Sequence, residues 1–417
     1  MNKHNSVPNI RFRNFKDEWT EKKISNFIIK NSDKNKNLVI KNIESISNKT
    51  GFTKQSEQFD GYRVASQDIS NYYVISPNQF AYNPSRINVG SIAYKNKGED
   101  KSIISPLYIS FSTSSHINDH FLWFWFKTTS FKKQRIQFSE GGVRDTLQFE
   151  NLKKMDISFP LLQEQQKIGD FFSKLDKLLD LQQQKIDKLE LLKKALLQTL
   201  FPKHDTKIPE LRFKGYEGDW VDRRFVNCLA KIIDFRGKTP KKLGLSWSRN
   251  GNYRALSALN VKNGFIDKNI DVHFGNYDLY KKWMGKTELK KGDILFTTEA
   301  PMGNIAIIKD NEKYILSQRT IAFRVNEKNI NSLFLLYRLN TVSVKNKLMS
   351  LSTGGTAQGI SQKNLSYLFI SISNSLDEQK RIGNILAKVN HLIYLENKKL
   401  ENLQQVKKCL LQNMFVE

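Results

Sequence analysis

A forty-residue stretch that occurs twice constrains this chain more than any other feature. Leu162–Phe201 and Leu376–Phe415 align without a gap at a constant offset of 214 residues, and sixteen of the forty columns are identical. Each copy opens with the pattern E-Q-x-x-I-G, which begins at Glu164 and at Glu378. An alignment of this length is not a chance event, so the chain contains an internal duplication.

Both copies have the pattern of a long amphipathic helix. Apolar residues recur at steps of three and four, Lys, Asp and Gln occupy the other face, and no Pro interrupts the run. A helix of about 36 to 40 residues rises roughly 55 to 60 Å, which favours a partner along its length. The other copy is the simplest partner, in an antiparallel pair that acts as a rod between two domains. The alternative is that each copy is a separate core helix, but the length and the charged outer face argue against it.

A second repeat shows that the whole chain consists of two similar halves. The segment Pro8–Trp19 returns as Pro209–Trp220, at an offset of 201. We expect the short N-terminal repeat to close against the end of the C-terminal helix. The two halves differ most between the short repeat and the helix.

The segments between the repeats contain short β-rich runs separated by Gly, Pro, Asn and Ser, together with some helical stretches. They predict two α+β domains, with a short aromatic helix around Phe121–Phe126 and helices around Leu333–Met349. The predicted boundaries are 1–160 for the first domain, 161–203 for the first spacer helix, 204–373 for the second domain and 374–417 for the second helix.

Charge indicates the class of partner. The net charge is +26. The two helical regions contribute +3 of it, with seven Lys against six acids in the first and seven Lys or Arg against five acids in the second, so +23 lies on the remaining segments. An excess spread over globular domains is typical of proteins that bind nucleic acid, although a merely soluble basic protein is the alternative.

The location of the protein follows from cysteine usage and hydropathy. Cys228 and Cys409 have no metal-binding or disulfide spacing, which indicates a reducing compartment. The N-terminus lacks an apolar signal, and Phe121–Phe126 is too short to span a bilayer. We therefore expect a cytoplasmic protein without a membrane partner.

Several motifs, in order and duplicated, resemble the specificity subunit of type I DNA restriction-modification systems over nearly the whole chain. They are the paired E-Q-x-x-I-G helix starts, the paired P-x-[IL]-R-F segments, and the runs Phe80–Ile92, Ser105–Phe111 and Leu289–Ile308. The resemblance implies a non-catalytic subunit whose two target-recognition domains each bind one half of a split double-stranded DNA sequence. It also implies two modification subunits that methylate adenine from S-adenosylmethionine, and restriction subunits that translocate and cleave DNA. No cofactor is expected in this chain.

Motifs for catalysis are incomplete. Asn83-Pro84-Ser85-Arg86 begins like the adenine methyltransferase tetrad N-P-P-[FY] but departs from it at the third and fourth residues. Gly237-Lys238-Thr239 ends like a phosphate-binding loop but lacks the earlier Gly and is followed by Pro240. His116 and His120 share a helical face without a third metal ligand, so a structural role is favoured. These departures favour a DNA-binding subunit over a modification enzyme fused to its own recognition domain, and the two unlike domains argue against an RNA-binding adapter.

Basic and amide side chains in the loops are the candidates for DNA contact, since Arg and Lys bind phosphates and guanine while Asn and Gln bind adenine edges. In the first domain they are Arg86, Lys95, Lys97 and Arg144; in the second they are Arg236, Lys238, Lys241, Lys242, Arg254, Arg319 and Gln358. Any single basic residue among them is more often a phosphate contact or a solvated charge than a base contact, so the loops are better candidates than the individual residues.

Overall fold

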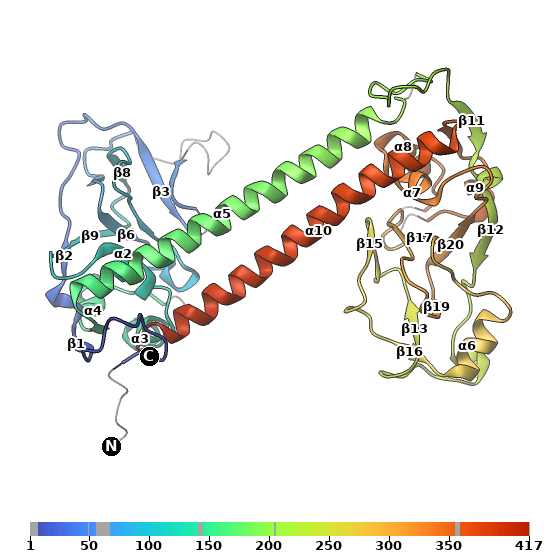
Figure 1. Cartoon of the computed structure of the whole chain (residues 1–417). Helices are drawn as coiled ribbons and strands as arrows, with labels where there is room; N and C mark the ends of the chain where they lie inside the picture. Colours follow the sequence, from blue (N-terminus) through green and yellow to red (C-terminus); the bar gives the residue numbers. More distant parts are fainter. Residues whose placement is uncertain are drawn as a thin grey trace. The chain divides into compact units, whose positions relative to one another are not determined.

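The computed structural model describes residues 7–48, 50–55, 67–140, 145–203, 206–354 and 359–416. The chain forms two compact units, and each long helix contributes to both. The first unit comprises Met1–Gln183 with Lys399–Glu417, and the second comprises Gln184–Lys398. Figure 1 shows the elements of both units. No helix of the described residues is long and apolar enough to cross a membrane.

The duplicated stretches form the long helices α5 (Leu162–Thr199) and α10 (Leu376–Asn413), each of 38 residues. In the second unit Lys193 donates to Asn390 Oδ1 at 2.8 Å and Lys185 donates to Glu396 Oε1 at 2.5 Å. Partner numbers fall on α10 as they rise on α5, so these parts of the helices run antiparallel. In the first unit α5 and α10 are joined by an ion pair between Asp176 and Lys407. The predicted helix pair is confirmed.

In the first unit two four-stranded sheets, in the orders β2-β9-β6-β7 and β4-β3-β8-β5, and the small β1-β10 pair lie beside short helices. The elements, in chain order, are β1 (Thr20–Lys23), η1 (Ile24–Asn26), β2 (Ile28–Lys30), β3 (Ile43–Ser47), β4 (Gly51–Lys54), β5 (Tyr73–Ile75), β6 (Gln79–Tyr82), η2 (Ile87–Val89), β7 (Ile92–Tyr94), β8 (Ser102–Ile104), β9 (Ile109–Thr113), α2 (Asp119–Trp125), α3 (Thr129–Phe138), α4 (Phe149–Leu152) and β10 (Asp156–Phe159). The aromatic run Phe121–Phe126 lies on α2 and its C-cap, and most of its side chains enter the core, as predicted.

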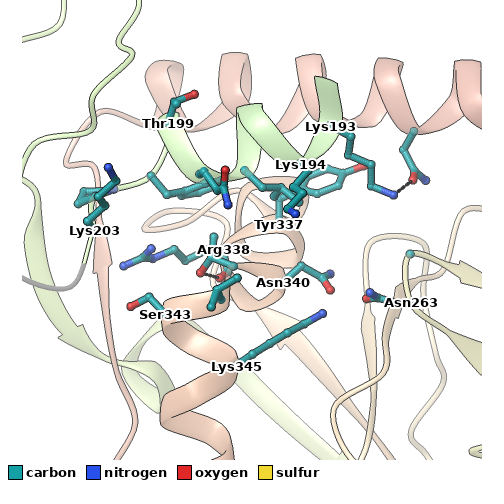
Figure 2. A pocket seen from close by; sticks show the side chains of 18 of the residues that line it. Lys193, Lys194, Thr199, Lys203, Asn263, Tyr337, Arg338, Asn340, Ser343 and Lys345 are labelled. Carbon is teal, nitrogen blue, oxygen red and sulfur yellow. Dashed lines mark hydrogen bonds between the residues drawn. The ribbon is translucent and has the colours of Figure 1, made fainter. Parts of the chain in front are cut away.

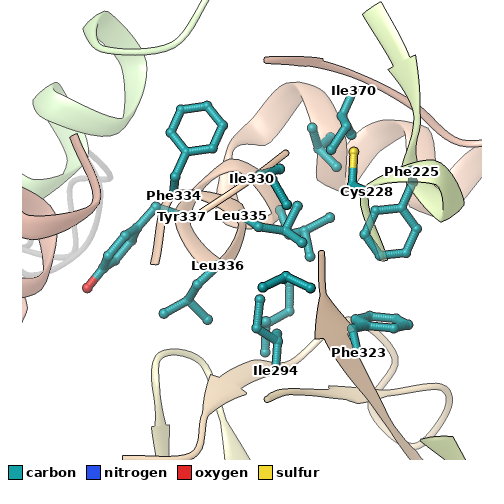
Figure 3. Close-up of a cluster of buried hydrophobic side chains, with 14 of the residues drawn as sticks. Phe225, Cys228, Ile294, Phe323, Ile330, Phe334, Leu335, Leu336, Tyr337 and Ile370 are labelled. Atoms are coloured by element: carbon teal, nitrogen blue, oxygen red, sulfur yellow. The ribbon is translucent and has the colours of Figure 1, made fainter. Parts of the chain in front are cut away.

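The second unit has one four-stranded sheet in the order β12-β20-β17-β18, a three-stranded sheet β16-β13-β19, and the pairs β14-β15 and β11-β21. Its elements are β11 (Val221–Arg224), η3 (Phe225–Cys228), β12 (Leu229–Asp234), η4 (Lys241–Leu243), β13 (Tyr253–Leu256), β14 (Val261–Lys262), β15 (Phe265–Ile266), β16 (Phe274–Gly275), α6 (Tyr277–Met284), β17 (Ile294–Thr297), β18 (Ile305–Ile307), β19 (Tyr314–Leu316), β20 (Thr320–Val325), α7 (Ser332–Asn340), α8 (Val342–Ser350), α9 (Gln362–Leu365) and β21 (Phe369–Ile372). The largest core cluster packs α7 against the four-stranded sheet (Figure 3).

Helices are predicted around Leu333–Met349, and the structure confirms them as α7 and α8, which meet at Thr341. Thr341 takes an extended conformation (ψ 148°) between α7 and α8, and its hydroxyl donates to the carbonyl of Arg338 at 2.7 Å. A Thr side chain that bonds the backbone locally competes with helix continuation. The chain therefore turns at Thr341.

The E-Q-x-x-I-G pattern is repeated because it performs the same packing task in each unit. In the second unit Glu378, which is fully buried, accepts two hydrogen bonds from Arg212, at 2.7 and 3.1 Å. Gln379 accepts from the backbone N–H of Asn331, the N-cap of α7, at 2.8 Å. Gly383 lies against the same turn: an added Cβ would lie 2.9 Å from the N–H nitrogen of Phe334.

The first unit repeats these contacts with the residues of the first copy. Glu164 accepts from Arg11 at 2.7 Å through both carboxylate oxygens, and Gln165 accepts from the N–H of Asn118, the N-cap of α2, at 2.8 Å. A Cβ on Gly169 would lie 2.7 Å from the Cβ of His120. The motif thus fixes the first turn of each long helix to the unit that precedes it in the chain.

The far end of each long helix completes a core. Phe201 follows α5 and packs against Phe334 and Trp220 in the second unit, and Phe415 follows α10 and packs against Phe121 and Trp19 in the first. The short repeats close against these helix ends: the N–H of residue 211 donates to the carbonyl of residue 199 at 2.9 Å, and that of residue 10 to residue 413 at 2.8 Å. The latter contact confirms the predicted closure of the N-terminal repeat.

Candidate nucleic-acid interface

Most of the predicted loops of the second unit lie at one end of the four-stranded sheet, where its strands begin or end. The antiparallel register places the end of β12 (Asp234), the start of β20 (Thr320), the end of β17 (Thr297) and the start of β18 (Ile305) at the same edge. We call this the loop edge. The segments that leave these strand ends are 235–244, 298–304 and 317–319, and the segment 359–362 lies beside them.

Hydrogen bonds hold these loops together. The N–H of Thr298 donates to the carbonyl of Arg319 at 2.9 Å, and the N–H of Ile360 donates to the carbonyl of Thr298 at 3.1 Å. Gln318 Nε2 donates to the carbonyl of Lys238 at 3.2 Å, which ties the segment 235–244 to the start of β20. Glu299 and Gly359 form an isolated β-bridge. The loop edge is therefore a connected surface.

The predicted cations on the segment 235–244 differ in availability. Arg236 is bound to the carboxylate of Asp234, with Nη2 2.6 Å from Oδ2, and Gln362 donates to the same oxygen at 2.7 Å. Burial alone would raise the pKa of Asp234, but the hydrogen bonds from Arg236 and Gln362 outweigh it and the pKa is lowered. Lys238 is half-buried and donates to the carbonyl of Trp283 at 2.5 Å.

The exposed cations of the loop edge are Lys241, Lys242 and Arg319. Lys241 and Lys242 lie on η4, and Lys242 donates to the carbonyl of Gly237 at 3.0 Å. Arg319 takes a left-handed backbone conformation (φ 61°), and its guanidinium lies 3.4 Å from the carboxylate of Glu299. A loosely held, exposed guanidinium is available for another acceptor.

The first unit has the same edge. Its sheet β2-β9-β6-β7 has the strand order of β12-β20-β17-β18, and the segment 83–91 joins β6 to β7 as 298–304 joins β17 to β18. The N–H of Leu147 donates to the carbonyl of Pro84 at 3.1 Å, and Tyr82 donates to the carbonyl of Leu147 at 3.1 Å. Arg86 is exposed on this loop. Arg86, a candidate from the sequence, therefore lies at the loop edge.

Other predicted residues lie elsewhere. Lys95 is buried, with its ammonium 2.7 Å from the carboxylate of Glu44 and 3.1 Å from Ser102 Oγ, so it is engaged inside the unit. Lys97 is exposed but follows the opposite end of β7 from Arg86. Arg254 lies on β13, where it donates to the carbonyl of residue 268 at 2.7 Å and stacks on residue 274. Arg144 and Gln358 lie outside the described residues.

The sequence prediction missed Gln318 and Gln362, whose amides lie at the loop edge. Both are exposed, and amide side chains can bind the edge of an adenine. Their positions depend on strand register: Gln318 precedes β20, and Gln362 begins α9. The one available signal is that Gln318 directly precedes Arg319, which the sequence had already singled out.

Comparison with known proteins supports the same function as the sequence motifs. The type I restriction enzyme MjaVIII specificity subunit of Methanocaldococcus jannaschii is 28% identical over 331 residues, which are 78% of this chain and 75% of that protein. A crystal structure of a type I restriction-modification S subunit from M. genitalium covers 99% of both chains with a TM-score of 0.64 at 14% identity. A chain from a structure described as the basis of complex assembly and conformational transition of the type I R-M system covers 94% of this chain and 96% of its own length, with a TM-score of 0.52 at 16% identity. These two likenesses show the fold.

The family model for the type I restriction modification DNA specificity domain matches the chain twice, over residues 16–191 and 219–405. The two matches take in both units and most of both long helices. The chain therefore belongs to the type I restriction-modification DNA specificity family, the non-catalytic subunits that give these enzyme complexes their DNA specificity.

Proposed function

We propose that each unit binds one half of a bipartite double-stranded DNA target through its loop edge. The observation that carries this proposal is the repetition of one strand order and one pair of edge loops with different residues in them. A common frame with unlike loops suits a protein that binds two different short sequences with the same geometry. In this proposal residues 1–160 and 204–373 are the recognition domains, and 161–203 and 374–417 are the spacer helices.

The chemistry of the loop edges suggests a role for each side chain. Lys241 and Lys242 are exposed, and phosphate contact suits them. Arg319 has the planar, charged fork that matches the O6 and N7 acceptors of guanine. Arg236 is a positioning residue, because Asp234 already occupies its guanidinium.

In the first unit Arg86 takes the corresponding place, and Lys95 is left out because it is buried against Glu44. DNA contact by Lys97, Lys238 and Arg254 stays a prediction, because these side chains do not lie at the exposed part of the loop edge. Arg144 and Gln358 stay predictions as well.

The assembly follows from membership of the family. We infer that two modification subunits bind this chain, hold S-adenosylmethionine and methylate adenine in the target, and that restriction subunits add translocation and cleavage. The expected location is the cytoplasm, where the DNA substrate is accessible. The chain itself contributes DNA binding and a frame for the partners.

Exchange of a recognition domain tests the proposal. Residues 20–160 would be replaced by those of a relative, and the methylated sequence would be mapped on genomic DNA in cells that also carry the modification subunits. We expect one half of the target to change and the other to keep its bases. The matched exchange of 221–373 should change the other half. If either exchange altered both halves, the two units would not bind DNA independently.

A further inference from the structure

A pocket in the second unit lies apart from the loop edge. It encloses about 650 Å³ between the last turns of α5, the corner where α7 meets α8, and the turn that joins β14 to β15 (Figure 2). Five cationic side chains and two acidic ones line it: Lys193, Lys194, Lys203, Arg338, Lys345, Glu190 and Glu210. The lining therefore carries a formal excess of positive charge.

The two acids are already engaged with two of the lysines. Lys203 forms an ion pair with Glu210, and Lys193 lies 3.8 Å from the carboxylate of Glu190. Among the residues that the structure describes, no acid forms an ion pair with Lys194, Arg338 or Lys345. The surplus charge of the pocket resides on these three side chains.

Arg338 is the most unusual of them. Only 3% of the residue is exposed, and its Nε and Nη1 atoms are buried without a hydrogen-bond partner within the described part of the chain. Burial lowers the pKa of Arg338 to about 10, while Asp222 acts on it only through space. The guanidinium lies over the Phe201 ring, with Cζ 5.7 Å from the ring centroid, but two buried N–H groups without acceptors are costly and indicate a missing partner.

The charge of Lys345 also has no acidic partner among the described residues. It is half-buried on α8, and burial lowers its pKa, with a further lowering by the nearby charge of Lys193. An anion in the pocket would offset both effects. The charge of the pocket is therefore organised for an anionic ligand.

The first unit provides an internal comparison. Asn118 and Asn331 are the N-caps of α2 and α7, so Trp125 occupies the position of Arg338. The Trp125 side chain is buried in the aromatic core, which shows that this fold position does not require a charge.

A second difference between the units concerns the acid beside the pocket. Asp176 in the first unit pairs with both Lys127 and Lys407, whereas its counterpart in the second unit is the neutral Asn390, which Lys193 contacts instead. Asp176 is thus the counter-charge of Lys407 in the first unit, whereas the acid nearest to Lys193 in the second is Glu190, at 3.8 Å.

We propose that the pocket lined by Arg338, Lys194 and Lys345 binds phosphates of the DNA backbone, as a contact separate from the loop edges. This inference rests on the proposed DNA-binding function and adds a second contact surface to it. In Figure 2 Arg338 extends to the Lys203 side of the pocket and Lys345 to the Asn263 side. Cations at separate ends of one pocket suit successive phosphates of a strand better than one carboxylate, which has two acceptor oxygens.

The test is the salt dependence of DNA binding by the full chain. Each phosphate contact contributes about 0.9 to the slope of log K against log salt concentration. We expect Arg338→Met and Lys345→Gln each to lower the slope by about one and to weaken target and non-target DNA equally. Arg338→Lys should restore most of the slope. Lys347→Gln, on the same helix but outside the pocket, is the matched control and should leave the slope unchanged.

The outcomes separate this proposal from the function itself. If Lys241→Gln and Lys242→Gln lower the slope while the pocket variants do not, the pocket proposal fails and the loop-edge proposal stands. If the wild-type slope is nearly flat, both fail. If the pocket variants keep their slope but lose assembly with the modification subunits, the anion is a carboxylate of a partner and the phosphate proposal is overturned. If a thermal melt shows that Arg338→Met does not fold, the salt slope of Lys345→Gln alone tests the proposal, because Lys345 is only half-buried.

Discussion

The end of α10 should stabilise the first unit, although most of that unit lies more than 250 residues earlier in the chain. Phe415 is 2% exposed, and its ring centroid lies 5.1 Å from Phe121 and 6.4 Å from Trp19. Replacement of a buried Phe by Ala costs about 3 to 5 kcal/mol. We expect Phe415→Ala to lower the stability of the first unit by that amount and to leave the second unit intact.

Phe201 provides the reciprocal variant. Its ring centroid lies 5.4 Å from Phe334 and 6.0 Å from Trp220, all in the second unit. We expect Phe201→Ala to destabilise the second unit by a similar amount. Leu191→Ala is the control, because this side chain on α5 is 67% exposed and its loss should change stability by less than about 0.5 kcal/mol.

Hydrogen exchange followed by mass spectrometry distinguishes the two units. A loss of 3 to 5 kcal/mol corresponds to roughly a hundredfold to a few thousandfold faster exchange of the slowest core amides. Phe415→Ala should accelerate exchange in β9 and α2, and Phe201→Ala in β20 and α7. Equal acceleration in both units by either variant would refute the idea that each helix end completes one core.

Two further variants and the pH dependence of stability probe the frame. Glu378→Gln should cost about 3 kcal/mol in urea unfolding, because it leaves Arg212 without its buried counter-charge. Gly383→Ala should destabilise by up to about 2 kcal/mol, because the new Cβ meets the Cβ of Leu333 at 2.9 Å and this crowding exceeds the gain in helix propensity. Burial lowers the pKa of Lys127 to about 8, below its value in the unfolded chain, so the stability of the first unit should rise from about pH 8 toward pH 10, as urea midpoints would show.

Matched controls accompany these variants. Asp377→Asn breaks the exposed pair with Arg381 and should cost less than about 0.5 kcal/mol, so a similar loss from Glu378→Gln would contradict the importance of burial. Asn384→Ala, exposed beside Gly383, should be neutral or slightly stabilising. Lys127→Met should abolish the rise with pH, and an unchanged rise would assign it to other groups.

The long helices were predictable because their signal is local. A period near 3.6 continues over 38 residues without Pro, and the repeat identifies the two helices as equivalents. Helices were also predicted around Leu333–Met349, but not the position of the break at Thr341, because apolar periodicity continues through it and the side-chain bond to the carbonyl of Arg338 marks the turn. Local patterns thus predict the type of an element better than they predict where that element is interrupted.

The candidate site was predictable at the level of loops and less so for single residues. Arg86 and Arg319 lie at the loop edges, where glycine-rich and polar segments between strands indicated a surface. The burial of Lys95 could not be foreseen, because its partner Glu44 lies 51 residues away on β3 and meets it only in the folded unit. Tertiary contacts decide which basic side chains form ion pairs inside the protein and which remain at the surface.

The duplication separates the residues that hold the fold from those that we propose to bind DNA. Glu378, Gln379 and their counterparts in the first copy are buried and contact an N-cap or an Arg of the same unit. Lys241 and Lys242 are exposed and contact the frame little. Surface substitutions change stability by about 0.5 kcal/mol or less. If the loop edges bind DNA as proposed, changes there alter the DNA sequence that is bound without loosening the long helices, and the two halves diverge in specificity while they keep one architecture.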